Sequence, residues 1–171
     1  MNQSMNQRDM FFKWLYYAGA VLLLVLVQSL VLNRISVWAV HPFLPPVIAG
    51  IMAMLEGPAE GAVFGGVFGL LCDLTMPGVI PCFYTLAFLA AALPAAMIAK
   101  RLLSQGFLCA VLCAALALVI TDLLHTVLLT FRQGVELSAG LSLTGRELAV
   151  TVVLSPLVYL LLRSVHNRIL R

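Results

Sequence analysis

Charged residues are scarce in this chain of 171 residues. Only 10% of the residues are Asp, Glu, Lys or Arg, whereas 63% are hydrophobic and the mean hydropathy is +1.07. Soluble globular domains carry about 25% charged residues, so the composition excludes a soluble domain and indicates an integral membrane protein. The basic residues gather at the ends of apolar runs and form no basic face, which argues against nucleic-acid binding.

Catalytic and metal-binding motifs are also missing. The four cysteines form no CxxC pair, so we expect buried, reduced thiols, no disulfide and no metal site. No GxSxG elbow occurs, and Ser29 and Ser155 differ from His125 in expected depth, which leaves no pair of nucleophile and base. The sequence therefore predicts neither an enzyme nor a cofactor-binding protein.

The apolar runs are long enough for several membrane spans of about 20 residues each. They predict one all-α transmembrane domain over residues 1–171, a compact bundle with six spans at approximately 14–32, 37–55, 59–76, 79–99, 106–131 and 147–162. Pro42, Pro45 and Pro46 interrupt the second run, because proline disfavours helix directly before itself. We therefore expect a short or re-entrant entry to the second helix. Residues 132–146 are expected to form an outer loop that lies in solvent, lies on the membrane surface or receives a partner.

Six spans place both termini on the same side of the membrane. Of the 10 Lys and Arg residues, all flank that side except Arg34, Arg132 and Arg146. Because basic residues accumulate in cytoplasmic loops, we expect both termini in the cytoplasm.

Small residues recur at every fourth position in two neighbouring runs. The third run carries a glycine ridge: Gly57, Gly61, Gly65 and Gly69. The fourth run carries an alanine stripe: Ala87, Ala91, Ala95 and Ala99. On an α-helix this spacing places each set on one face, and such faces let helices pack closely inside a bilayer. We expect the alanine stripe to be the partner of the glycine ridge.

Three ionisable residues lie inside the expected spans, where burial is costly: Asp73, Asp122 and His125. The helical rise places Asp73 and Asp122 roughly 21 and 24 Å from the inner ends of their spans, with His125 one turn further out. Two interpretations stay open. The residues form a polar pocket open to the outside, for a ligand group, a cation or a partner's segment. Alternatively, Asp73 caps the following turn and Asp122 bonds locally to His125.

The third run also carries a motif. The segment from Glu56 to Gly61 (EGPAEG), followed by Gly65 and by the segment from Gly69 to Leu74 (GLLCDL), resembles the signature of the rod shape-determining protein MreD family. Weaker similarities lie elsewhere, at Gln28-Ser29, Pro45-Pro46 and Ser155-Pro156-Leu157 with Arg163. The segment before Pro45 departs from the family, whose members often show a Pro-Asp-Leu type sequence there.

The resemblance implies a non-enzymatic scaffold subunit of the bacterial cell-elongation complex, located in the cytoplasmic (inner) membrane. Its partner would be the bitopic protein MreC and, through MreC, the MreB filaments, RodA and a class B penicillin-binding protein. Membrane lipids would surround it. The family is also similar in fold to substrate-binding subunits of energy-coupling-factor transporters, which supplies a second hypothesis. In that case Asp73, Asp122 and His125 would line a closed cavity for a small molecule.

Overall fold

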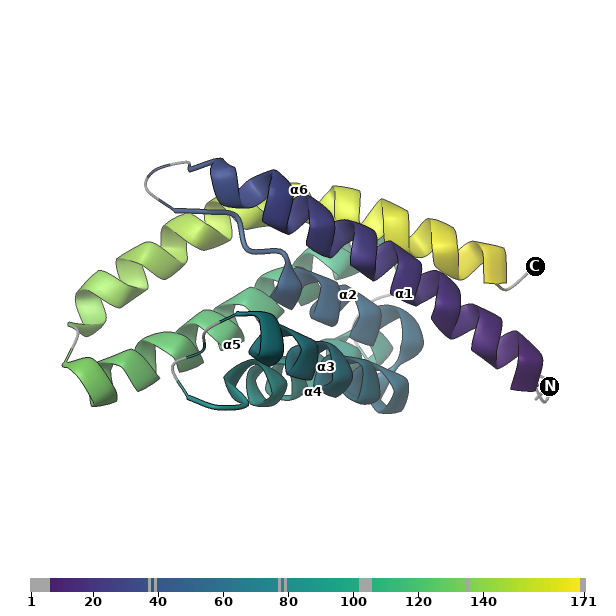
Figure 1. Ribbon diagram of the computed structural model, residues 1–171, viewed down its shortest axis with the longest axis horizontal. Coiled ribbons are helices and arrows are strands. Elements are labelled where there is room, and N and C mark those ends of the chain that lie inside the picture. Colours follow the sequence, from purple (N-terminus) through teal and green to yellow (C-terminus); the bar gives the residue numbers. More distant parts are fainter. Residues whose placement is uncertain are drawn as a thin grey trace.

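The computed structural model describes residues 7–36, 38, 40–76, 78, 80–101, 106–134 and 136–169. These residues form an all-α fold, and no strand occurs among them. The elements follow one another along the chain (Figure 1) as α1 (Gln7–Leu30), the 3-10 helix η1 (Leu32–Arg34), α2 (Pro45–Glu56), α3 (Pro58–Thr75), α4 (Phe83–Arg101), α5 (Phe107–Gln133) and α6 (Leu137–Ile169). Residues 37, 39 and 79, which fall inside two expected spans, lie outside the described part of the chain.

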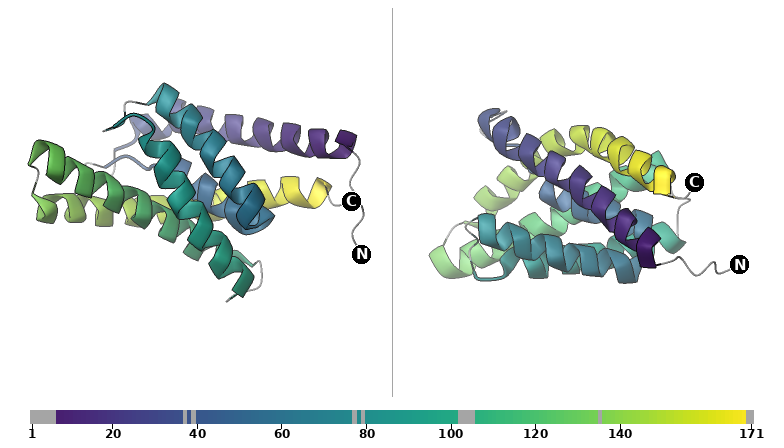
Figure 2. Two further views of the ribbon diagram at one scale, coloured as in Figure 1. Left: turned by 90° about the horizontal axis from the view of Figure 1, so that it is seen from below. Right: turned by 45° about the vertical axis from the view of Figure 1, so that its right-hand side comes forward.

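Consecutive helices run back and forth, so the start of α1 and the end of α6 lie at the same end of the bundle (Figures 1 and 2). Four helices, α1, α4, α5 and α6, are long and apolar enough to cross a membrane. The expected class, an all-α multi-pass membrane protein, is therefore confirmed. α2 has only 12 residues, fewer than the roughly 20 of a full span, so the count of six spans stays a prediction.

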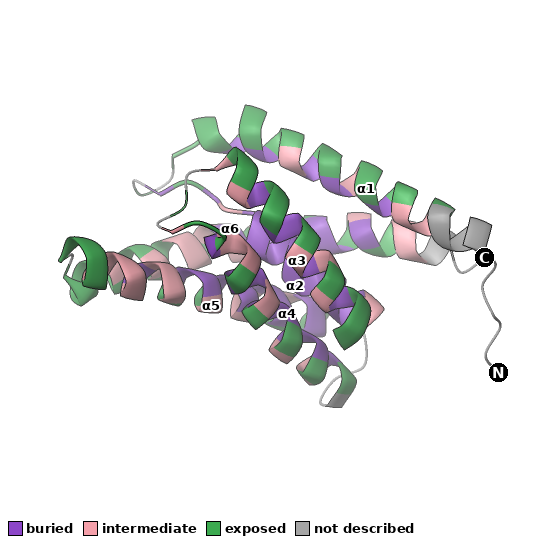
Figure 3. Ribbon diagram, turned by 60° about the horizontal axis from the view of Figure 1, so that its bottom comes forward, coloured by how far each residue is buried: buried purple, intermediate pink, exposed green. Residues whose placement is uncertain are grey.

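α2 forms the centre of the bundle. Every residue from Pro45 to Leu55 is buried, and α2 packs against α3, α4, α5 and α6 (Figure 3). A helix that is apolar on all sides avoids water either inside a protein core or inside a membrane, and here other helices surround it. Pro45 and Pro46 occupy its first turn, where the missing N–H of proline costs nothing. The helix itself therefore begins at Pro45 and not at residue 37, because these prolines form its first turn instead of interrupting it.

The expected loop over 132–146 is also wrong, because α6 begins at Leu137 and continues to Ile169. Gly134 ends α5 with a left-handed φ of 66° and donates its N–H to the carbonyl of Thr130 at 3.0 Å, a common way to end a helix. The resulting α5–α6 hairpin extends beyond the other helices (Figure 1). Polar residues at the start of α6 lower the local hydropathy, so hydropathy alone did not predict that this part of the chain is helical.

α3 meets both α2 and α4 along the glycine ridge. A Cβ atom on Gly61 would lie 2.5 Å from Ala53 Cα in α2, and one on Gly69 would lie 2.6 Å from Thr85 Cα in α4. Both distances are shorter than real Cβ contacts, so only glycine fits at these two positions. Gly57 differs, because it adopts a φ of +89° in the turn between α2 and α3 and has open space beside it.

The alanine stripe does not oppose the glycine ridge in the way expected. A Cβ atom on Gly65 would have Phe88 O at 3.3 Å and Ala92 Cβ at 3.4 Å as its nearest neighbours. These two residues lie one position beyond the stripe, a rotation of about 100° around α4. The stripe is buried but on another side of α4, where Ala95 O accepts a hydrogen bond from Cys113 Sγ of α5 at 3.4 Å.

The ridge gives a paired test of packing. We expect Gly69→Ala to destabilise the protein by about 1–3 kcal/mol, because the new methyl group meets the backbone of α4. Gly66→Ala is the matched control, since its Cβ would lie 3.7 Å from the nearest atom, Leu89 Cδ2, and should be neutral or stabilise by up to about 1 kcal/mol. Thermal unfolding in detergent measures both, and equal midpoints for the two variants would contradict the packing argument.

Candidate functional site

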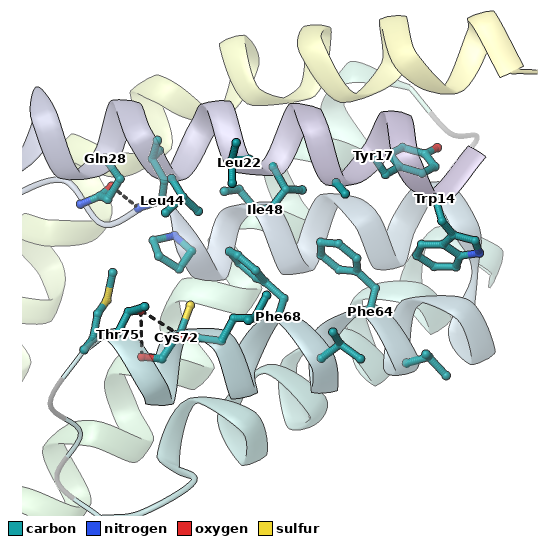
Figure 4. A pocket seen from close by; sticks show the side chains of 18 residues that line it. Trp14, Tyr17, Leu22, Gln28, Leu44, Ile48, Phe64, Phe68, Cys72 and Thr75 are labelled. Atoms are coloured by element: carbon teal, nitrogen blue, oxygen red, sulfur yellow. Dashed lines mark hydrogen bonds between the residues drawn. The ribbon is translucent and has the colours of Figure 1, made fainter. Parts of the chain in front are cut away.

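An apolar groove of about 570 Å³ lies between α1 and α3. Figure 4 shows it extending from Trp14 and Phe64 at one end to Gln28 and Thr75 at the other, with Phe68 in its wall. Along α1 this is a length of about 21 Å, since an α-helix rises 1.5 Å per residue. The groove therefore follows most of the hydrocarbon thickness of a bilayer, about 30 Å.

Both walls of the groove have the residue spacing of helix-packing surfaces. On α1 the lining residues include positions spaced alternately four and three apart: Trp14, Ala18, Val21, Val25 and Gln28. On α3 they include positions spaced four apart: Val63, Val67, Leu71 and Thr75. Spacings of three and four residues are those of helices that pack side by side. However, the backbone of α1 lies close to that of α6 and not to that of α3.

A cluster of charged residues joins α1 to the rest of the bundle at the first end of the groove. Glu56, at the end of α2, has a side chain only 4% exposed and forms an ion pair with Lys13 of α1. Tyr17 Oη of α1 donates a hydrogen bond to Glu56 Oε1, and His166 Nδ1 of α6 lies 3.0 Å from the same oxygen. Lys13 also donates to Glu60 of α3 at 2.8 Å. Four helices therefore meet at this one cluster.

The partners of Glu56 control its ionisation. Burial by itself raises the pKa of this carboxyl group, but hydrogen bonds from His166, Lys13 and Tyr17 outweigh that effect and lower the pKa to about 2. Because the pKa in the folded protein lies below its ordinary value of 4.5, ionised Glu56 stabilises the fold at neutral pH. This contribution is lost as the pH falls from 4.5 toward 2.

A buried amide joins α1 to α2 at the other end of the groove. Gln28 is 2% exposed, and its Nε2 donates to Asn33 Oδ1 and to Pro42 O, both at 2.9 Å. Its Oε1 accepts the N–H of Leu44 at 3.0 Å. Leu44 precedes the two prolines that begin α2, so Gln28 satisfies a backbone donor at a helix start that has no cap of its own.

A polar pocket of about 430 Å³ lies beyond Gln28, between α5, α6 and residues 40–43. Asp122 and His125 of α5 both line it, together with Glu147 of α6. Asp122 is 8% exposed, and its Oδ2 has no hydrogen-bond partner in the described part of the protein. The ring of His125 packs on Phe83 with 5.5 Å between centroids. The structure thus brings two of the three ionisable candidates into one cavity.

Asp73 has a different role. Its carboxylate accepts hydrogen bonds from the N–H of Tyr84 at 2.8 Å, from the N–H of Thr85 at 2.9 Å and from Thr85 Oγ1 at 2.7 Å. It therefore caps the start of α4, across the connection from its own helix α3, and it does not line the polar pocket. The similar depth of Asp73 and Asp122 did not place them in one site.

Glu147 is not among the site residues predicted from the sequence, because it lies at the start of the last expected span. A signal was present, because polar residues recur three and four positions apart along this part of α6: Thr144, Glu147, Thr151 and Ser155. Thr151 and Ser155 are fully buried, and Thr151 Oγ1 accepts the N–H of Phe43 at 3.1 Å. A polar stripe with helical spacing predicts a helix face turned away from lipid.

These features define the class of the protein: an all-α, multi-pass membrane protein with a lateral apolar groove and a separate polar pocket. Comparison of the chain with protein-family models, with curated proteins and with solved structures finds no match.

The charged cluster gives a second paired test. We expect Glu56→Gln to lower the free energy of unfolding by about 2–4 kcal/mol at pH 7, because it leaves Lys13 without its buried partner. Glu60→Gln is the matched control, since the side chain of Glu60 is 50% exposed and should contribute less than about 1 kcal/mol. Chemical unfolding in mixed micelles provides the measurement. Losses of equal size would mean that Glu56 does not hold the cluster together.

The same variant tests the pH dependence. The difference in unfolding free energy between the native protein and Glu56→Gln should have its largest value above pH 4.5 and should shrink as the pH falls toward 2. The reason is that protonation of Glu56 removes the charge that its partners bind. Thermal unfolding midpoints of both proteins, measured in parallel between pH 7 and the acid range, give this difference. A difference that stays constant over that range would contradict the assignment.

Proposed function

We propose that this protein is a non-enzymatic membrane scaffold that binds the single transmembrane helix of a bitopic partner in the groove between α1 and α3. We further propose that the partner is MreC, in the cell-elongation complex of the bacterial inner membrane. In this proposal α2 and α3 also cross the membrane, which makes six spans with cytoplasmic termini. The groove is the observation that carries the proposal.

The dimensions and chemistry of the groove support a helix as its occupant. Its length of about 21 Å along α1 corresponds to about four turns of helix. Leu22 on one rim and Val63 and Val67 on the other are 65%, 63% and 59% exposed, so an inserted helix has apolar side chains to contact on both sides. Helices associate in a bilayer through such close contacts, since leaving lipid supplies little driving force.

The motif that resembles the MreD family lies where it determines the shape of the groove. Glu56 and Glu60 both bind Lys13 of α1, and this contact holds the first end of α1. Gly61 and Gly69 hold α3 against α2 and α4, on the side away from α1. The residues behind the resemblance are therefore those that keep the two walls of the groove apart, which supports a shared function in partner binding.

A substitution in the groove tests the proposal. Val67→Trp should reduce recovery of co-expressed MreC from the same organism by about fivefold or more, because the indole fills space that the partner helix needs. Val153→Trp on α6 is the matched control, since Val153 is 73% exposed, does not line the groove and should leave recovery unchanged. Affinity purification in mild detergent, normalised to the amount of tagged protein, measures both.

Two results would contradict the scaffold proposal. One is equal recovery of MreC with both tryptophan variants. The other is recovery of an ATPase pair with its membrane coupling subunit in place of MreC, which would assign the protein to small-molecule transport.

A further inference from the structure

The polar pocket between α5 and α6 contains two acidic residues that form no ion pair within the described part of the protein. Asp122 and Glu147 both line it and interact electrostatically with each other. Among the described residues of the lining, none is Lys or Arg. His41 is the basic group that acts on Glu147, and its Nδ1 already lies 3.1 Å from the carbonyl of Ile35. His125 also lines the pocket, but its ring packs on Phe83 and leaves Asp122 Oδ2 without a hydrogen bond.

Asp122 is the residue that points to a ligand. It is 8% exposed, so more than nine-tenths of it is buried, and its Oδ2 is the one buried side-chain polar atom without a partner among the described residues. A buried carboxyl oxygen that makes no hydrogen bond costs free energy, and buried polar groups in folded proteins are nearly always satisfied. A donor that enters the pocket would remove this cost.

Thr126 and Thr144 add hydroxyl groups to the lining, whereas Leu129 and Leu143 supply an apolar wall. Within the described part of the chain, no group of three or more His, Cys, Asp or Glu residues is arranged to hold a metal ion. An organic cation with N–H donors and a short carbon chain suits this combination, since charged N–H donors form the strongest hydrogen bonds to carboxylates.

We propose that the polar pocket binds a primary ammonium or guanidinium group, with Asp122 and Glu147 as its acceptors. The cation comes either from a small free amine or from a Lys or Arg side chain of a partner protein. The pocket is separate from the groove between α1 and α3, so this inference does not depend on the scaffold proposal. It also explains why an acidic residue is buried in a helix long and apolar enough to cross the membrane.

The first experiment uses the purified full chain in lipid nanodiscs with n-butylammonium as the probe. The probe should raise the thermal unfolding midpoint in a saturable way at constant ionic strength, whereas neutral n-butanol should not. Asp122→Asn should raise the n-butylammonium concentration needed for half-saturation by about tenfold or more. Glu136→Gln is the matched control, since Glu136 is an exposed carboxylate next to the same hairpin and outside the pocket. Glu147→Gln gives a second test at the other acceptor.

The second experiment addresses a side chain of a partner. A photo-reactive amino acid at Leu143, which lines the pocket and is 49% exposed, is irradiated in native membranes, and the cross-linked peptide is identified by mass spectrometry. A peptide with Lys or Arg next to the cross-link, lost in Asp122→Asn and kept in Glu136→Gln, supports a basic side chain as the ligand. Saturable binding of n-butylammonium that needs Asp122 supports a small amine. If neither result is obtained, the proposal is overturned.

Discussion

The close approach of helix backbones at a few glycines is the constraint on which the rest of the structure depends. Gly61 brings α3 onto α2, Gly69 brings it onto α4, and a Cβ atom on Gly50 would lie only 2.7 Å from Cys113 O in α5. These contacts join α2, α3, α4 and α5 into a dense block with α2 buried at its centre. Since α3 is fixed against α2 and α4, it stays apart from α1, and the groove is the space between them.

α1 therefore needs another means of attachment. In a bilayer an apolar helix gains little by exchanging lipid for protein. The backbone of α1 approaches that of α6, and Tyr17, Val21 and Leu24 of α1 belong to the apolar core shared with α2. Polar bonds at its two ends link it to that block. Glu56 binds Lys13 and Tyr17 at one end, and Gln28 binds the segment before α2 at the other. Both groups are shielded from water. In this low-dielectric environment hydrogen bonds and ion pairs are stronger than in water.

Periodicity made part of this arrangement predictable. The spacing of the glycines predicts a packing ridge because it depends only on the geometry of one helix. Which face of α4 meets Gly65 was not predictable, since one residue along a helix rotates the face by about 100° and several faces of α4 carry small residues. Depth was estimated from the rise per residue, but depth alone cannot say that Asp122 faces a cavity while Asp73 caps α4.

Gln28 shows why the groove and the pocket keep different chemistry although they are neighbours. It lines both of them. Both N–H groups of its amide are used by Asn33 and Pro42, and its oxygen accepts the N–H of Leu44. An amide has only two N–H donors, so Gln28 has none left to satisfy the free Oδ2 of Asp122. Recognition there depends on Asp122 and Glu147, while the groove is left with an almost entirely apolar wall.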